Sequence, residues 1–141
     1  MTREAIVAML AARQEAINRR DVAFVAGQHA PACEQDSPLA GGRVTGRDAI
    51  AALYEAWFSG FPDLVWTSDE PIVDGDLATQ MTTLSGTDTG GFMDLAPTGK
   101  PFRATIVWLF TIADGQFTHV RPIYDFTGVL VQIGLLKAKP I

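Results

Sequence analysis

The stretch from residue 102 to residue 124, FRATIVWLFTIADGQFTHVRPIY, decides the fold class. It contains two runs rich in β-branched and aromatic residues, 102–112 and 116–124, separated by Asp114-Gly115. An Asp-Gly pair between two such runs is typical of a tight β-hairpin. The stretch therefore predicts two neighbouring antiparallel strands.

Two more long strands are predicted upstream of this hairpin. Residues 64–68 and 77–87 have a similar composition, and Asp74-Gly75 marks a turn before the longer run. A shorter extended piece is expected over residues 32–37. After the last strand, residues 126–137 are predicted to form a short closing helix.

The N-terminal part of the chain is predicted to be helical. Residues 2–20 place apolar side chains near one helical face. Asp21 is positioned to cap a second short helix, which Gly27 would end. A third helix follows Gly46, because apolar and aromatic residues recur at helical spacing over residues 50–61.

Helices followed by hairpin-linked strands favour one α+β domain over residues 1–141. The expected architecture is a curled antiparallel sheet wrapped around the N-terminal helices, forming a cone with an apolar pocket. A chain of this length buries roughly 70% of its unfolded surface around a single core.

Composition excludes several classes of protein. The net charge of −5 repels phosphate backbones, so no nucleic-acid partner is expected. No apolar run reaches the roughly 20 residues of a membrane span, so no membrane partner is expected either. Cys33 is the only cysteine and is expected to be a small buried hydrophobe. These features favour a soluble cytoplasmic protein.

Seven short segments carry a resemblance to a known family. They are 46–50 (GRDAI), 61–63 (FPD), 86–90 (GTDTG), 96–100 (APTGK), 114–115 (DG), 125–130 (DFTGVL) and 132–134 (QIG). Together they resemble the SnoaL-like polyketide cyclase family of the nuclear transport factor 2-like superfamily, which also contains ketosteroid isomerase.

The resemblance implies a pocket that works without metal or organic cofactor. In cyclases of this family an Asp removes a proton from a carbon next to carbonyls, and the resulting enolate closes a ring. Such a base needs apolar surroundings that raise its pKa. The resemblance also implies a homodimer formed through the open sheet face.

This chain departs from the family pattern at two positions. The acid/base Asp of the family falls on Pro122, and a His of the cyclases falls on Trp108. The epoxide hydrolases of the superfamily also place an Asp at the first position, so their mechanism does not transfer either.

Two other acids are therefore the candidate catalytic residues, Asp125 and Asp88. Asp125 is nearest to the vacant position, but it also precedes a helix and could serve as its N-cap. Asp88 lies where relatives often carry His, but it could also be a solvated turn residue.

Several side chains are expected to contact a ligand. Trp108 would form a flat pocket wall that favours a flat, cyclic, carbonyl-bearing compound. For Trp57, Phe110 and Tyr124, a role in the core is the alternative. The full set is Gln35, Asp36, Trp57, Trp108, Phe110, Val120, Pro122 and Tyr124.

Three functions remain open at this point. The first is a cofactor-independent cyclase or isomerase, the second is a binding protein that has lost this chemistry, and the third is a hydroxylase-like relative. No metal site is expected, because His29 and His119 are far apart and lack acidic partners at tight spacing.

Overall fold

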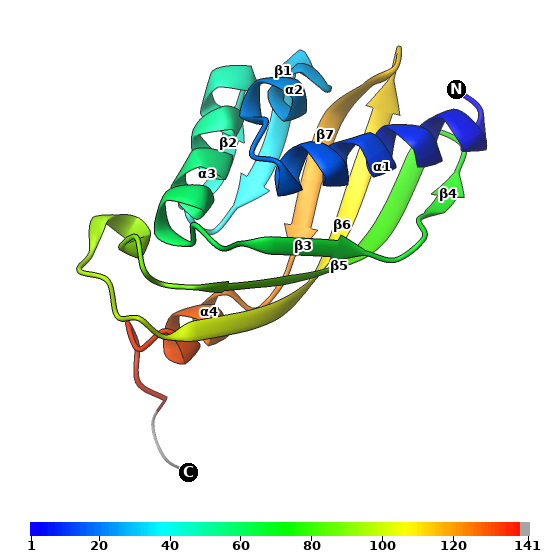
Figure 1. Cartoon of the computed structure of the whole chain (residues 1–141). Helices are drawn as coiled ribbons and strands as arrows, with labels where there is room; N and C mark the ends of the chain where they lie inside the picture. The colour runs from blue at the N-terminus through cyan, green and yellow to red at the C-terminus, as the bar shows by residue number, and fades with distance from the viewer. Residues whose placement is uncertain (139–141) are drawn as a thin grey trace.

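The computed structural model describes residues 1–138 and shows the N-terminal helices on one side of a bent sheet (Figure 1). Within these residues the helices are α1 (Arg3–Asn18), α2 (Val22–Gly27), α3 (Arg47–Gly60) and α4 (Phe126–Gln132), with a 3-10 turn, η1 (Phe92–Asp94). The strands are β1 (His29–Ser37), β2 (Gly42–Thr45), β3 (Val65–Ser68), β4 (Ile72–Asp74), β5 (Leu77–Thr87), β6 (Pro101–Ala113) and β7 (Gln116–Ile123).

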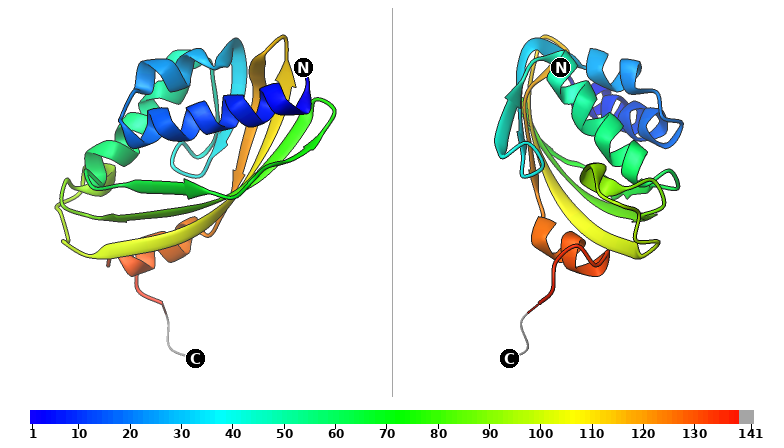
Figure 2. Two further views of the ribbon diagram at one scale, coloured as in Figure 1. Left: turned by 45° about the vertical axis from the view of Figure 1, so that its right-hand side comes forward. Right: turned by 90° about the vertical axis from the view of Figure 1, so that its left-hand side faces the viewer.

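One sheet contains all of these strands. Its order is β2-β1-β7-β6-β5-β3, and β4 also pairs with β5. The β5–β6 ladder is the longest, running from Leu77 opposite Thr111 to Thr87 opposite Pro101. Figure 2 shows the sheet curling around α1 and α3, which lie on its concave side, whereas α4 lies near the opposite end of the molecule. The predicted α+β cone is confirmed.

The helix starts follow from local side-chain chemistry. Thr2 accepts a hydrogen bond from the backbone N–H of Ala5 and so begins α1. Asp21 does the same for Phe24 and begins α2, as the sequence predicts. These contacts satisfy amide groups that the first turn of a helix leaves without an intrahelical acceptor.

The structure differs from the sequence expectations at the shorter elements. Strands β2 and β4 were not expected, and β1 begins at His29 instead of residue 32. Helix α4 ends at Gln132, before the expected residue 137. One strand pair, β1 with β7, is parallel, so the sheet is mixed and not antiparallel throughout.

The core lies between α1, α3 and the concave sheet face. Ile6, Leu10 and Ile17 of α1 are almost fully buried, as are Ile50 of α3 and the sheet residues facing them. Cys33 of β1 is fully buried, as expected, and has no disulfide partner. Among residues 1–138, no helix is long and apolar enough to cross a membrane.

Candidate functional site

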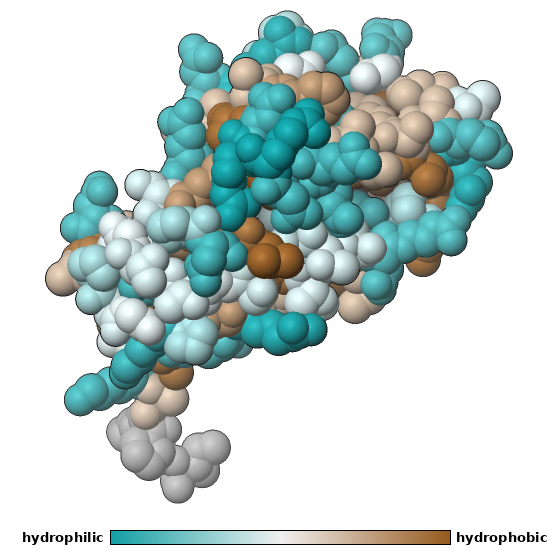
Figure 3. Space-filling model, in the orientation of Figure 1, coloured by the Kyte–Doolittle hydropathy of each residue, from teal (hydrophilic) through white to brown (hydrophobic). Residues whose placement is uncertain are grey.

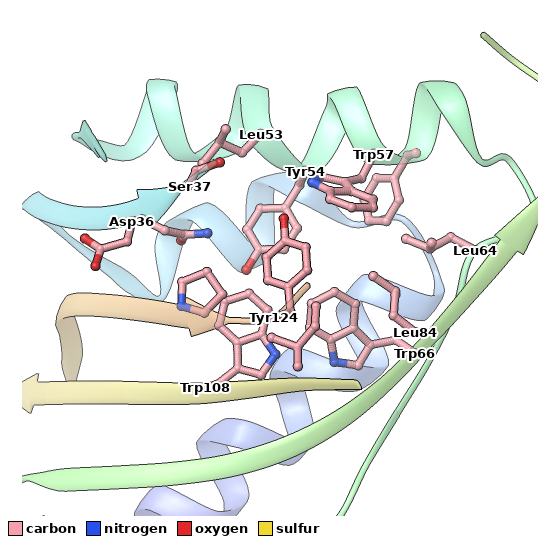
Figure 4. Close-up of a pocket in the computed structure, with 14 residues that line it drawn as sticks. Asp36, Ser37, Leu53, Tyr54, Trp57, Leu64, Trp66, Leu84, Trp108 and Tyr124 are labelled. Atoms are coloured by element: carbon pink, nitrogen blue, oxygen red, sulfur yellow. The ribbon is translucent and has the colours of Figure 1, made fainter. Parts of the chain in front are cut away.

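A pocket opens between α3 and the concave face of the sheet (Figure 4). About 460 Å³ of space, the open mouth included, is free of protein atoms. Its aromatic lining consists of Tyr54, Trp57, Phe58, Trp66, Trp108 and Tyr124. The rest of the lining is Gln35, Asp36, Ser37, Leu53, Leu64, Leu84, Ile106 and Pro122.

Trp108 forms one wall of this pocket. It lies on β6 directly opposite Pro122 of β7, so the two side chains share the concave face. The Trp108 ring stacks on Phe110 at 6.0 Å between centroids and lies 5.4 Å from the ring of Trp66. These contacts hold the indole in place as a flat apolar surface.

Trp57 and Tyr124 form the other aromatic side. Their ring centroids are 6.2 Å apart in an edge-on arrangement, and Trp57 also contacts Phe92 at 4.9 Å. Burial raises the pKa of the Tyr124 phenol above its usual value. Tyr124 therefore stays neutral at physiological pH and is able to donate a hydrogen bond.

Arg13 lies behind the pocket with only 1% of its surface exposed. Its Nη2 donates a 2.6 Å hydrogen bond to the Tyr54 hydroxyl. The guanidinium carbon lies 4.3 Å from the ring centroid of Trp108 and 5.1 Å from that of Trp66. Arg13 is thus held by aromatic faces and one phenol oxygen.

His29 of β1 is a fully buried titratable group whose ionisation is influenced by Arg13. Its Nδ1 contacts the Val25 carbonyl oxygen at 2.8 Å. Burial, followed by the positive charge of Arg13, lowers the pKa of His29 to about 4. The imidazole is therefore neutral at pH 7 and adds no second positive charge beside Arg13.

Several buried polar atoms of the lining have no hydrogen-bond partner within residues 1–138. They are Oε1 of Gln35 and the indole Nε1 atoms of Trp66 and Trp108. Buried polar groups normally have partners, so such a cluster marks a place where a ligand or water can supply them. The pocket is thus apolar with a few hydrogen-bonding points.

Asp36 lies at the pocket rim, and its carboxylate contacts side chains outside the pocket lining. It accepts hydrogen bonds from Arg43 at 3.0 Å and from Arg121 at 3.4 Å, and lies 3.2 Å from His119 Nε2. Burial acts to raise the pKa of Asp36, but the hydrogen bonds from His119 and Arg43 outweigh it and lower the pKa. In Figure 4 the carboxylate points away from the labelled aromatic side chains.

Asp88 does not reach the pocket, in contrast to its expected catalytic or rim position. It is fully buried, so the solvated-turn alternative is also wrong. Its carboxylate accepts hydrogen bonds from the backbone N–H groups of Gly91, Phe92 and Thr98 and from the Thr98 hydroxyl. Asp88 therefore organises the loop that places Phe92 against Trp57.

Asp125 does not line the pocket either. Its side chain is exposed and accepts a 2.8 Å hydrogen bond from the Gly128 N–H, which makes it the N-cap of α4. This is the alternative that the sequence left open.

Six of the eight expected ligand contacts line the pocket, whereas Phe110 and Val120 do not. Both are at most 1% exposed and belong to the core below it, Phe110 as the support of Trp108.

The comparison with protein families agrees with this geometry. The sequence profile of the SnoaL-like polyketide cyclases matches residues 7–133. The chain belongs to this family. Membership in the family supports a cyclase- or isomerase-type function for this SnoaL-like protein, and it supports a small molecule as the ligand. It does not specify a mechanism or a catalytic residue.

Solved structures similar to the SnoaL-like protein have the same fold. TsrD from Streptomyces laurentii is 25% identical, with a TM-score of 0.84, covering 96% of this chain and 99% of its own. IdmH from Streptomyces antibioticus, for which polyketide cyclase activity has been suggested, is 25% identical. The TM-score is 0.75, and the match covers 89% of this chain and 96% of IdmH. A comparison with curated proteins gives no match.

Sequence reasoning missed Arg13 and Tyr54, which meet at the base of the pocket of the SnoaL-like protein. A signal for Arg13 was present, because it continues the buried positions of Ile6, Leu10 and Ile17 on α1. A charge within an apolar helical stripe indicates a functional or specially partnered side chain. In the described part of the chain, no group of three His, Cys, Asp or Glu side chains is arranged to hold a metal ion.

Proposed function

We propose that this SnoaL-like protein binds a flat, conjugated carbonyl compound and promotes its enolisation, leading to ring closure or isomerisation, without metal or organic cofactor. Family membership supports the reaction class. The observation that carries the proposal is a pocket walled by aromatic rings and containing hydrogen-bond donors that have no acceptor among residues 1–138.

The aromatic walls favour the proposed ligand by shape and contact. Trp108 and Trp66 present ring surfaces on the sheet side, Trp57 lies by α3, and the Tyr124 ring lies between them in the view of Figure 4. Each well-placed aromatic pair contributes about 0.5–1.5 kcal/mol beyond its burial. A planar conjugated molecule makes such contacts on both faces.

The proposed chemistry places charge on a carbonyl oxygen of the ligand. A C–H bond next to two carbonyls breaks, its proton passes to water at the pocket mouth, and its electron pair moves onto the oxygen as an enolate. The enolate carbon then attacks a second carbonyl carbon, whose C=O π electrons move onto its oxygen, and this alkoxide takes a proton from water. Alternatively, the enolate is reprotonated at another carbon. Hydrogen-bond donors such as the indole N–H groups of Trp66 and Trp108 stabilise the enolate oxygen more than the neutral carbonyl.

We propose water as the proton acceptor because no carboxylate of residues 1–138 points into the pocket. Asp125 and Asp88 lie outside it, and Asp36 is turned toward Arg43 and Arg121. The substrate must therefore carry an already acidic carbon, as a β-dicarbonyl compound does.

Deuterium exchange into ethyl benzoylacetate, an aromatic β-keto ester, tests the proposal. Proton NMR in D₂O should show loss of the activated methylene signal at least about tenfold faster with the wild-type protein than with buffer alone. Trp108→Leu should remove most of this acceleration by removing the wall. Phe24→Leu, on an exposed side chain of α2, is the matched control and should retain it.

A specific observation favours a second function, binding without catalysis. Pro122 occupies the position at which the resemblance expects the base, and it lines the pocket. Saturable binding of the keto ester with no acceleration of exchange would support this second function and contradict the first.

A further inference from the structure

The guanidinium of Arg13 is a buried charge without a carboxylate partner among the described residues. Its Nη2 contacts Tyr54, and its Nε has no hydrogen-bond partner in residues 1–138. The ring centroids of Trp108, Trp66 and Phe110 lie 4.3–5.1 Å from its guanidinium carbon. Ring faces attract a cation, but they do not neutralise its charge.

The other charged and titratable groups around the pocket do not cancel this charge. His29 of β1 is neutral, and the phenol of Tyr124, beyond β7, is neutral as well. The rim carboxylate of Asp36 is already paired with Arg43 and Arg121, and His119 contacts the same oxygen as Arg43. The pocket-facing residues of β3 and β6, Trp66, Ile106 and Trp108, have no acidic side chain.

The hydrogen bond between Arg13 and Tyr54 has a definite direction. A guanidinium has donors only, so the Tyr54 oxygen must accept. The Tyr54 hydroxyl proton has no acceptor among the hydrogen bonds of residues 1–138, and Tyr54 lines the pocket. A phenol whose oxygen accepts from a cation becomes a stronger donor, because consecutive hydrogen bonds polarise one another.

We infer that the pocket binds its ligand through a negatively charged oxygen conjugated to the flat ring system, and that this oxygen accepts the hydrogen bond of Tyr54 with Arg13 behind it. This inference rests on the proposed function and names its substrate class, an acidic enol or phenol-like compound bound as its anion. Tyr54 is the residue that contacts the ligand oxygen, and Arg13 is a positioning residue that acts through Tyr54.

The inference accounts both for the buried guanidinium of Arg13 and for the aromatic walls of the pocket. A buried, unpaired guanidinium is energetically unfavourable, so its presence needs a compensating gain. An anionic ligand supplies the missing negative charge, and the aromatic walls exclude water and so strengthen the attraction. The same arrangement stabilises an enolate as it forms.

A pair of matched probes tests the inference. Para-nitrophenol ionises near neutral pH to a yellow anion, whereas para-nitroanisole has nearly the same shape and cannot ionise. Absorbance titrations across the ionisation of the free phenol give the affinity for each form. The wild-type protein is expected to bind the anion about ten- to hundredfold more tightly than the neutral phenol, the factor typical of a hydrogen bond to a charged group. Bound probe should therefore stay yellow to a pH at least about one unit lower than free probe.

Three variants connect this preference to the two residues. Tyr54→Phe keeps the ring and is expected to weaken anion binding about tenfold more than nitroanisole binding. Arg13→Met keeps the volume without the charge and should do the same, whereas Arg13→Lys should restore part of the preference. Tyr124→Phe removes a hydroxyl from the same pocket with no guanidinium behind it and should weaken both forms equally.

The outcomes separate this inference from the proposed function. Equal affinity of the wild-type protein for anion and neutral phenol would overturn the inference and leave the proposed function standing. If both Tyr54→Phe and Arg13→Met still prefer the anion, the preference comes from the rim cations Arg43 and Arg121. This result would also overturn the inference. Failure of both probes to bind would contradict the aromatic pocket on which both proposals depend. Circular dichroism verifies that each variant is folded.

Discussion

At the scale of single residues, the two acids singled out from the sequence have structural roles. Asp88 and Asp125 both accept backbone hydrogen bonds, but they differ in burial and in the number of donors that they satisfy. The same substitution should therefore have different consequences at the two positions.

Asp88→Asn is expected to destabilise the fold by about 2–3 kcal/mol. The amide NH2 group replaces one of the two oxygens that accept hydrogen bonds from buried N–H groups, and it cannot accept them. Asp125→Asn should change stability by less than about 0.5 kcal/mol, because Asn caps helices as well as Asp does. Urea unfolding measures both values. Deuterium exchange per folded molecule should remain near wild type in both variants, and a large loss in either would restore that acid as a catalytic candidate.

Pro122 offers a gain-of-function test. Pro122→Asp would place a carboxylate in the apolar pocket opposite Trp108, where burial raises its pKa and makes it a better base. We expect exchange into the β-keto ester to accelerate by about 10²-fold, the lower range for general-base catalysis. An unchanged rate in a folded variant would show that this position does not face the reacting carbon.

The burial of Asp88 shows where sequence reasoning reached its limit for the site. A segment rich in Gly and Thr around an Asp is typical of an exposed turn. Here the partner hydroxyl comes from Thr98, ten residues away, and the loop between them closes over the carboxylate. The family resemblance, by contrast, placed Pro122 among the ligand contacts, and Pro122 does line the pocket.

At the scale of secondary-structure elements, segments with a clear period, composition or capping residue could be predicted, and two short strands could not. Strands β3, β5, β6 and β7 lie within one residue of their expected ends. Strands β2 and β4 have only four and three residues. Strand β3 is as short as β2, but it begins with Val65 and Trp66, whereas β2 begins with Gly42, a residue depleted in strands. The parallel pairing of β1 with β7 joins distant parts of the chain, and no local turn signal specifies it.

The convex face of the sheet leads to a prediction about assembly. Met81 of β5, Val107 of β6 and Ile123 of β7 are direct neighbours across adjacent strands. Met81 is 50% exposed and Ile123 is 55% exposed. The opposite, helix-bearing side in Figure 3 shows mainly hydrophilic surface with separate hydrophobic areas. A row of apolar side chains on an open sheet is suited to pairing with a second copy.

We therefore expect a homodimer formed through this row. Met81→Lys should shift the protein to a monomer in light scattering, while Ala8→Lys, on an exposed position of α1, should not. A wild-type protein that is monomeric at the highest concentration measured would contradict this expectation.

At the scale of the whole molecule, buried His29 makes stability depend on pH. Its pKa is about 6.5 in the unfolded chain and about 4 in the folded one, so the unfolded state binds more protons between these values. Stability is complete above about pH 6.5 and falls as the pH decreases toward 4, by about 3 kcal/mol in total. The lowered pKa of Asp36 acts in the same direction in more acidic solution.

Urea unfolding at a series of pH values checks this prediction. The wild-type protein should lose stability between pH 6.5 and pH 4, and His29→Gln should show a flatter profile because its side chain does not titrate. An equally steep profile in the variant would assign the pH dependence to other groups.

The single thiol of the chain provides an internal reporter of how often the cone opens. Cys33 is fully buried, and burial, with a contribution from Glu34, raises its pKa to about 11, so an alkylating reagent reacts only when β1 becomes exposed. The same strand contributes Gln35 and Ser37 to the pocket. A bound compound that holds β1 closed should therefore slow alkylation by the factor 1 + [L]/Kd. One mass-spectrometric time course would then rank candidate ligands by affinity, including colourless ones and ones that undergo no reaction.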